Sequence, residues 1–364
     1  MSFRKDNDAF EAWLAKQCNV VAKDVDTKHR RMKKSAFIFL RATYFRWAKQ
    51  IGKWCPELMN APQALSVGDL HLENFGTWRD ADGRLVWGVN DFDEAAVMPY
   101  PLDLVRLAAS IRLASGGSIS NQAAAAALLK GYREGLAQPQ PALLDEGETW
   151  LRPYAVGTDD KSKKFWKEVA LYPKADPPRK IADALIASLP KDAESVRFCS
   201  RVKGGGSLGR PRYVAVAFWR GGQVLREAKA LVPSAWTWAY DGKARASNFL
   251  ELANGQYRAP DPFLEVRDRF ILRRIAPDSR KIELGDGAGW SLKASLFEAM
   301  GFDLASIHAA GSPGAATLRA RSQKTTARLA QYRREDRGGG GQAGLRGVAE
   351  LTSFRSRSAI VSLL

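Results

Sequence analysis

Residues 67–95 read VGDLHLENFGTWRDADGRLVWGVNDFDEA, and this stretch decides how the rest of the chain is interpreted. Asp69 and Asn74 stand five residues apart and precede an Asp-Gly turn signal at 82–83. The apolar run at 85–89 then leads into the acidic sequence NDFDE. Turn and strand signals in this order predict a loop, a β-hairpin and a second acidic cluster.

These side chains suit the transfer of a nucleotide's γ-phosphoryl group. That reaction requires a carboxylate that orients and deprotonates the incoming hydroxyl, and oxygen ligands for the Mg²⁺ that bridges the phosphates. Asp69 suits the role of the base, and Asn74 and Asp91 suit the metal ligands. Asp93 could hold a second metal ion or steady the loop. We therefore expect a catalytic and magnesium-binding centre in this stretch.

Two simpler interpretations stay open. Carboxylates in loops are mostly solvated, so the stretch could be an ordinary acidic surface hairpin. The same carboxylates could instead bind Mg²⁺ or Ca²⁺ in a site of another class. We favour phosphoryl transfer because random loops rarely combine D-x4-N with a strand that ends in NDFDE.

A glycine-rich segment more than 100 residues downstream is the second candidate site. GGGSLG at 204–209 fits G-x-G-x-x-G, and two apolar strands at 213–219 and 223–231 follow it, joined by a glycine turn. A dinucleotide-binding fold would need a helix at the third glycine. The β-turn-β pattern is instead typical of the loop that covers ATP phosphates in kinases, and Lys229 would bind the α- and β-phosphates.

The order of these two sites is inverted relative to an ordinary kinase, where the glycine loop and lysine come first. Either the glycine hairpin is coincidental or the lobes are circularly permuted, which chain termini at the surface make feasible. We adopt the permuted arrangement. Glu251, in an expected helix that ends at Gly255, is the nearest acidic residue able to pair with Lys229. The expected nucleotide-binding residues are Gly204, Gly206, Ser207, Gly209, Lys229 and Glu251.

Length and composition predict two lobes. The chain has 364 residues, 45% of them hydrophobic, which is enough for a real core. The three cysteines form no CxxC pair and the three histidines no metal-binding cluster, so we expect reduced thiols in the cytoplasm. An apolar leader and a run of about 18 apolar residues are both absent from the sequence, which argues against export and a membrane span.

The net charge of +17 attracts anions without selecting among nucleotides, nucleic acid and acidic lipid. Residues 319–364 contain ten basic and three acidic residues, with the glycine run 338–341 among them, which indicates a flexible basic segment. Aromatic residues interleaved with basic ones near 28–50 could stack on bases, but at this density they more often form core. A nucleic-acid partner is therefore possible but not favoured.

The apolar periodicity predicts an α+β fold. We expect helices at 7–22 and 35–51, the second capped by Ser35. Asp103 is expected to cap a later helix, although it could instead bond the loop that carries Asp69, and His308 is expected to be a packed residue. The expected divisions are 1–190, a helical lobe with the catalytic and metal-binding loops; 191–285, a β-rich lobe with the glycine loop and lysine; 286–315, a helix returning to the helical lobe; and 316–364, a basic low-complexity tail.

Two positions differ from ordinary protein kinases. Val67-Gly68 stands where they have His-Arg, and Asp93 replaces the last glycine of Asp-Phe-Gly. GDxHxxN followed by an apolar-Asp-Phe-Asp segment resembles the aminoglycoside and choline phosphotransferase branch of the kinase-like fold. His71 falls where that branch also has His, so it joins Asp69 as a candidate catalytic residue.

Five motifs occur in order between about Lys28 and Gly311: SAFIFLRATYF, GDLHLENFG, NDFDEA, DLVRLAAS and a GxGSxG hairpin with its lysine strand. Together they resemble the uncharacterised bacterial domain-of-unknown-function family 2252. That family is grouped with the kinase-like superfamily, so the resemblance implies a protein-kinase-like, two-lobe fold, circularly permuted, with the helical catalytic lobe first. It implies no substrate. The chain departs from the family pattern at Lys203–Gly206 and after Gly311.

The expected function is ATP- and Mg²⁺-dependent phosphoryl transfer to a hydroxyl of an unknown small-molecule or protein acceptor. Transfer of AMP stays open within the same fold. The alternatives are a nucleotide-binding pseudokinase or regulatory module, and a basic nucleic-acid-binding protein whose acidic hairpin is structural.

Overall fold

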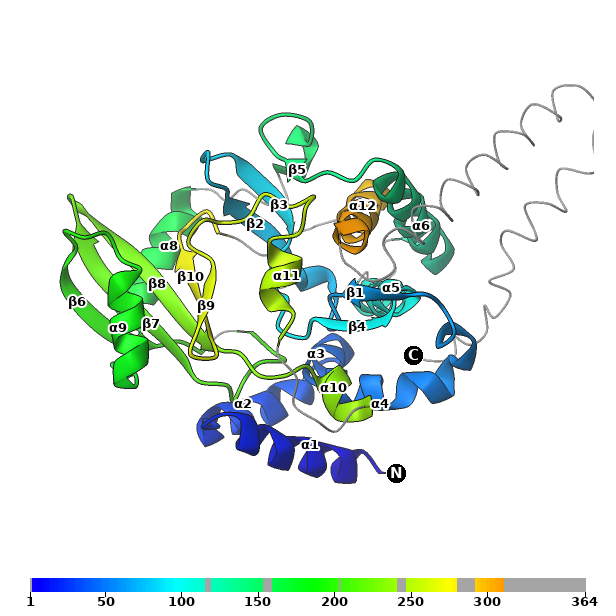
Figure 1. Cartoon of the computed structure of the whole chain (residues 1–364), viewed down its shortest axis with the longest axis horizontal. Coiled ribbons are helices and arrows are strands. Elements are labelled where there is room, and N and C mark those ends of the chain that lie inside the picture. The colour runs from blue at the N-terminus through cyan, green and yellow to red at the C-terminus, as the bar shows by residue number, and fades with distance from the viewer. Residues whose placement is uncertain are drawn as a thin grey trace, which may run out of the picture.

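The computed structural model describes residues 2–114, 119–152, 159–202, 204–240, 247–279 and 292–310. Within these ranges the protein combines helices with antiparallel strands, which confirms the α+β class. A five-stranded sheet lies at the left of Figure 1, and the helices α6 and α12 lie at the right. The expected basic tail at 316–364 lies outside the described residues.

Four helices open the chain, where the sequence predicted two. The first unpredicted break follows from a long-range contact, because the Val21 N–H donates to Gly209 O at 2.9 Å. The second lies at Thr43, whose hydroxyl bonds back to Phe39 O at 2.7 Å. The cap at Ser35 is confirmed, since its side chain accepts a backbone N–H of the first turn. The four helices are α1 (Phe3–Gln17), α2 (Ala22–Met32), α3 (Ala36–Ala42) and α4 (Tyr44–Trp54).

The predicted acidic hairpin forms. Strands β2 (Phe75–Arg79) and β3 (Leu85–Val89) pair antiparallel, and Gly83 in their turn has a φ of 77°. Consequently the sequence NDFDE follows directly from the end of β3, beside the loop that carries Asp69. The other short strands are β1 (Gln63–Ser66), which pairs with β4 (Ala96–Pro99), and β5 (Ala142–Leu143), which pairs with β3.

Glycines set the distance between two long helices that are far apart in sequence, α6 and α12 (Figure 1). A Cβ at Gly131 would overlap the carbonyl of Glu298, and one at Gly301 would overlap the carbonyl of Leu128. The two backbones therefore touch at positions where neither helix carries a side chain. The helices of this part are α5 (Pro101–Ala114), α6 (Asn121–Ala137) and α12 (Ala294–Ala310).

The large antiparallel sheet is covered by helices on both faces. Val214 and Val216 of β7 pack with Val169 of α8 (Asp159–Ala170). The intervening Ala215 and Ala217 pack with α9 (Arg179–Ala187) on the opposite face. Both helices precede the expected boundary near 190, which stays a prediction. The strands, in spatial order, are β6 (Glu194–Ser200), β7 (Arg212–Trp219), β8 (Gly222–Ala230), β10 (Phe270–Ile275) and β9 (Glu265–Arg267).

The short elements are the 3-10 turns η1 (Pro56–Leu58), η2 (Leu72–Asn74) and η3 (Thr149–Leu151), and the helices α10 (Ala235–Tyr240) and α11 (Phe249–Ala253). None of the helices in the described part of the chain has the length and apolar character needed to cross a membrane.

Replacing Gly301 by leucine should lower the free energy of unfolding by about 3 kcal/mol, because α6 and α12 must separate to admit the side chain. Urea unfolding followed by circular dichroism measures the change. Gly147→Ala is the matched control, since a Cβ there meets no atom within 4 Å. An unchanged unfolding midpoint for Gly301→Leu would show that the two helices do not touch in this way.

Candidate active site

Residues 67–74, called the catalytic loop below, connect β1 to β2 and depend on one glycine. Gly68 has a φ of 86°, and a Cβ there would overlap the carbonyl of Glu94 and lie 2.9 Å from the Tyr44 hydroxyl. The backbone conformation and the lack of space both exclude a side chain. Glycine is therefore required at position 68.

Asp103 on α5 anchors the catalytic loop from behind. Its fully buried carboxylate accepts the N–H groups of Val67 at 2.7 Å and Gly68 at 2.9 Å. His308 Nε2 lies 3.1 Å from the same carboxylate, and His308 Nδ1 lies 2.8 Å from the Tyr132 hydroxyl. Of the two roles considered from the sequence, Asp103 therefore takes the bond to the loop. His308 is a packed residue, as expected, and also supports Asp103.

Asp69 is held by a buried arginine, Arg106 of the DLVRLAAS motif, for which no role was predicted. Arg106 donates from Nε and Nη2 to Oδ1 of Asp69, at 2.8 and 2.6 Å. Arg106 also donates to Leu40 O at 2.7 Å and lies over the Tyr44 ring. Burial raises the pKa of Asp69, although Arg106 and Arg41 oppose the rise. An oriented carboxylate with raised proton affinity has the properties of a general base.

Two further predicted residues, His71 and Asn74, shape the catalytic loop. The His71 N–H donates to Asn74 Oδ1 at 2.7 Å, and Arg41 Nε donates to His71 Nε2 at 3.3 Å. The Asn90 N–H donates to Asn74 O at 3.0 Å, so the two acidic segments meet at this point. The amide oxygen of Asn74 thus bonds its own loop. A metal-binding role for Asn74 and a catalytic role for His71 stay predictions.

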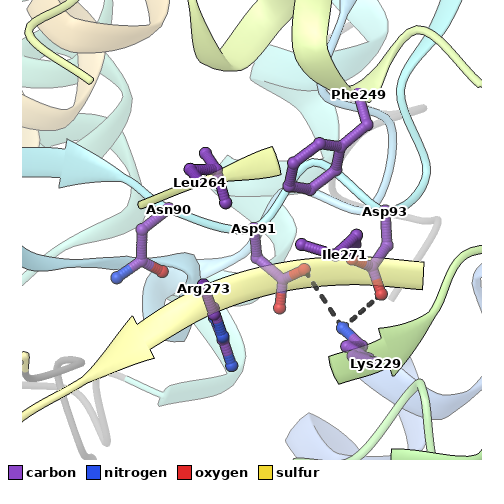
Figure 2. A pocket seen from close by; sticks show the side chains of 8 residues that line it. All are labelled: Asn90, Asp91, Asp93, Lys229, Phe249, Leu264, Ile271 and Arg273. Atoms are coloured by element: carbon purple, nitrogen blue, oxygen red, sulfur yellow. Dashed lines mark hydrogen bonds and ion pairs between the residues drawn. The ribbon is translucent and has the colours of Figure 1, made fainter. Parts of the chain in front are cut away.

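Lys229 on β8 joins the two candidate segments. Its ammonium contacts the carboxylate of Asp93 and lies 3.5 Å from Oδ1 of Asp91 (Figure 2). Nη1 of Arg210 lies 3.4 Å from Oδ2 of Asp93, the oxygen that Lys229 also contacts. Burial and the neighbouring Asp91 raise the pKa of Asp93, against the opposing effect of the two cations. Residues separated by 138 positions in sequence, Asp91 and Lys229, therefore share one site.

A cavity of about 20 Å³, room for about one water molecule, lies among these groups. In Figure 2, Phe249 and Leu264 lie above the two carboxylates, and Lys229 and Arg273 lie below them. The buried Oδ1 of Asn90 has no hydrogen-bond partner within the described ranges. The full lining is Asn90, Asp91, Asp93, Lys229, Phe249, Leu264, Ile271 and Arg273.

The glycine segment, residues 204–209, lies against the catalytic loop. A Cβ at Gly206 would lie 2.8 Å from Arg41 O and 3.3 Å from Oδ2 of Asp69. Ser207 Oγ accepts from Arg212 Nη2 at 3.4 Å. The structure therefore places the predicted glycine residues directly beside the predicted base.

Both ends of the glycine segment are tied to the region of α2. Gly204 O accepts from Arg31 Nη1 at 3.0 Å, and Gly209 O accepts the Val21 N–H at 2.9 Å. Gly209 has a φ of 98°, and a Cβ there would lie 2.7 Å from Val25 Cγ2. The segment is therefore held closed over Asp69 from the side of the amino-terminal helices.

Glu251 is the one predicted site residue that the structure leaves apart from the others. It is exposed on α11, whereas the carboxylates that contact Lys229 belong to Asp91 and Asp93. The structure therefore does not bring Glu251 and Lys229 into an ion pair.

A further buried charged group, missed from the sequence, surrounds Glu227 on β8. Burial alone would raise the pKa of this fully buried carboxyl, but the three arginines around it hold the pKa well below its usual range. Because these arginines come from separate segments, no local spacing reveals them. The sequence feature that could have indicated this group is the pair of charged residues Glu227 and Lys229 on one face of an apolar strand. The arginine contacts are Arg201 at 3.0 Å, Arg212 at 3.3 Å and Arg273 at 2.5 Å.

The donor atoms at the cavity fit a magnesium–nucleotide complex better than a metal held by protein alone. Among the residues that the structure describes, no three His, Cys, Asp or Glu side chains gather into a metal-binding group. The site offers the carboxylates of Asp91 and Asp93 and the unbonded amide oxygen of Asn90. Mg²⁺ at nucleotide sites takes one or two carboxylates and completes its shell with water and phosphate oxygens.

Glu227→Gln should lower the free energy of unfolding at pH 7 by about 3 kcal/mol, because three guanidinium groups lose their buried carboxylate. Since the native pKa of Glu227 is depressed, its stabilisation is complete above the ordinary value of 4.5 and is lost as pH falls through the native pKa. Urea titrations of both proteins at decreasing pH should therefore show the difference shrinking below about pH 4.

Glu265→Gln is the control for this measurement. Glu265 is a partly exposed carboxylate that pairs with Arg267 at 2.9 Å, so its loss should change stability by less than about 1 kcal/mol. A difference between Glu227→Gln and wild type that stays constant down to low pH would contradict the depressed pKa.

Comparison with known proteins relates the amino-terminal part of the chain to a described family. Residues 20–161 fit the model of a family described as "Uncharacterized protein conserved in bacteria (DUF2252)". No curated protein and no solved structure shows significant similarity to the chain. The matched range holds the catalytic loop, the acidic cluster and Arg106, but ends before the glycine segment and Lys229. The resemblance expected from the sequence is thus confirmed for residues 20–161, with that uncharacterised bacterial family.

Proposed function

We propose that this chain is an ATP- and Mg²⁺-dependent phosphotransferase with a kinase-like, circularly permuted arrangement, acting on a hydroxyl group. The observation that supports this most is the 3.5 Å between Lys229 Nζ and Asp91 Oδ1. In such enzymes a phosphate-binding lysine and a metal-binding aspartate flank the same nucleotide. An ordinary acidic surface hairpin gives no reason for these distant residues to meet.

Asp69 is the base of the proposed reaction. Arg106 occupies Oδ1 of Asp69, and Oδ2 faces the glycine segment. Asp69 takes the proton of the acceptor hydroxyl, whose oxygen forms a bond to the γ-phosphorus while the bond from that phosphorus to the leaving oxygen of ADP breaks. The raised pKa of Asp69 favours this proton transfer.

The remaining residues hold the nucleotide. Asp91 and Asp93, with an amide oxygen of Asn74 or Asn90, would hold Mg²⁺, which supplies neutralisation of the phosphate charge. When the nucleotide binds, the Lys229 ammonium would leave the carboxylates of Asp91 and Asp93 and contact phosphate oxygens instead. The cavity of about 20 Å³ is far smaller than a nucleotide site, so the side chains that line it would have to move apart for a nucleotide to bind.

Asp69→Asn should slow transfer of label from γ-labelled ATP by about a hundredfold or more while leaving ATP affinity within about twofold, because the amide cannot accept the proton. Autophosphorylation and a panel of sugar, amino-alcohol and serine-peptide acceptors provide the transfer assay, and calorimetry provides the affinity. Asp82→Asn, at an exposed turn position, is the control and should transfer normally.

Equal transfer by Asp69→Asn and wild type would contradict the proposal. A parallel assay with α-labelled ATP tests the transfer of AMP. Absence of any transfer by a wild type that still binds ATP would support the pseudokinase alternative.

Removal of metal should abolish most of the thermal stabilisation that ATP gives the protein, because Asp91 and Asp93 would then face the phosphates without a bridging cation. Asp91→Asn should lose the magnesium-dependent part of the shift even with excess Mg²⁺. The shift is measured by differential scanning fluorimetry with ATP, with and without EDTA, and Asp82→Asn again serves as control. A magnesium-dependent shift of wild-type size in Asp91→Asn would rule out this carboxylate as a ligand.

A further inference from the structure

The group around Glu227 carries more positive than negative charge inside the protein. Arg201 and Arg212 donate to one carboxylate oxygen of Glu227, at 3.0 and 3.3 Å, and Arg273 donates to the other at 2.8 and 2.5 Å. Three guanidinium groups thus share the carboxylate of Glu227, and the further carboxylates that act on Arg273 are those of Asp91 and Asp93, which Lys229 also contacts.

Such an excess is costly away from water. Arg201 and Arg212 are about 10% and 9% exposed, Arg273 is about 26% exposed, and Glu227 is fully buried. A buried cation needs an anionic partner and acceptors for its N–H groups. Within the described residues, the buried Nε of Arg201 has no acceptor. The group therefore has unused capacity to bind an anion.

The arginine group around Glu227 lies next to the proposed active site. Arg273 lines the cavity together with Asp91 and Lys229, and Figure 2 shows its side chain on the same side of the two carboxylates as Lys229. Arg212 reaches the glycine segment at Ser207 Oγ, 3.4 Å away. The arginines therefore extend from the glycine segment to the carboxylates, along the path that a nucleotide's phosphates would follow.

We propose that Arg273 and Arg212 bind the phosphate chain of a nucleoside di- or triphosphate, and that Glu227 is a positioning residue that holds both guanidinium groups in place. This inference rests on the proposed function and adds the groups that recognise the polyphosphate. Guanidinium suits the task because its planar N–H groups match two phosphate oxygens at once and its charge is permanent. The site should consequently select for polyphosphate over monophosphate.

The test is calorimetric titration of the full-length protein with ATP, AMP and inorganic tripolyphosphate. Arg273→Ala should weaken ATP and tripolyphosphate binding by about tenfold to a hundredfold, since it removes charge-assisted hydrogen bonds, and should affect AMP much less. Arg274→Ala is the matched control, because the next residue on β10 contacts Asp261 and Arg79 O instead. It should bind all three ligands as the wild type does.

Arg212→Ala provides a second variant from the other end of the group, and circular dichroism confirms that each variant is folded. If wild type binds ATP and both arginine variants bind it equally well, the inference is overturned while the proposed function stands. If wild type binds tripolyphosphate through these arginines but not ATP, the polyphosphate site stands and the proposed function fails. Binding of neither ligand by wild type overturns both.

Discussion

The contact of Lys229 with Asp91 and Asp93 is the interaction on which the arrangement of the molecule depends. The two carboxylates repel each other, and the Lys229 ammonium offsets this repulsion because it contacts both of them. Arg210 adds a second cation at Asp93 and also pairs with Glu94. Charge pairing therefore fixes the large sheet against the helical part, and a molecule that enters between them has to replace these charges.

Local patterns in the sequence predicted the parts of this site, because turns and strands are decided by neighbouring residues. The spacing of Asp69 and Asn74, the Asp-Gly turn and the acidic end of β3 located the catalytic loop and the hairpin. Alternation along β8 located Lys229. The breaks between the first helices were missed because they depend on tertiary contacts, such as the bond from Val21 to Gly209.

Most of the supporting contacts could not be predicted, because the partners lie far apart in the chain. Arg106 belongs to an apolar helix, and its partner Asp69 precedes it by 37 residues. The arginines around Glu227 come from three different segments. For Asp103, the local pattern favoured a cap on its own helix. Its carboxylate instead accepts two buried N–H groups of the adjoining loop, which water cannot reach.

The hydrogen bonds from Arg31 and Val21 to Gly204 and Gly209 have a mechanical consequence. An outward displacement of either end of the glycine segment breaks the hydrogen bond at that end or carries part of α2 along. Helix α1 is in turn fastened to α4 through ion pairs of Asp6. The position of the glycine segment over Asp69 thus depends on amino-terminal helices that lie outside the proposed active site.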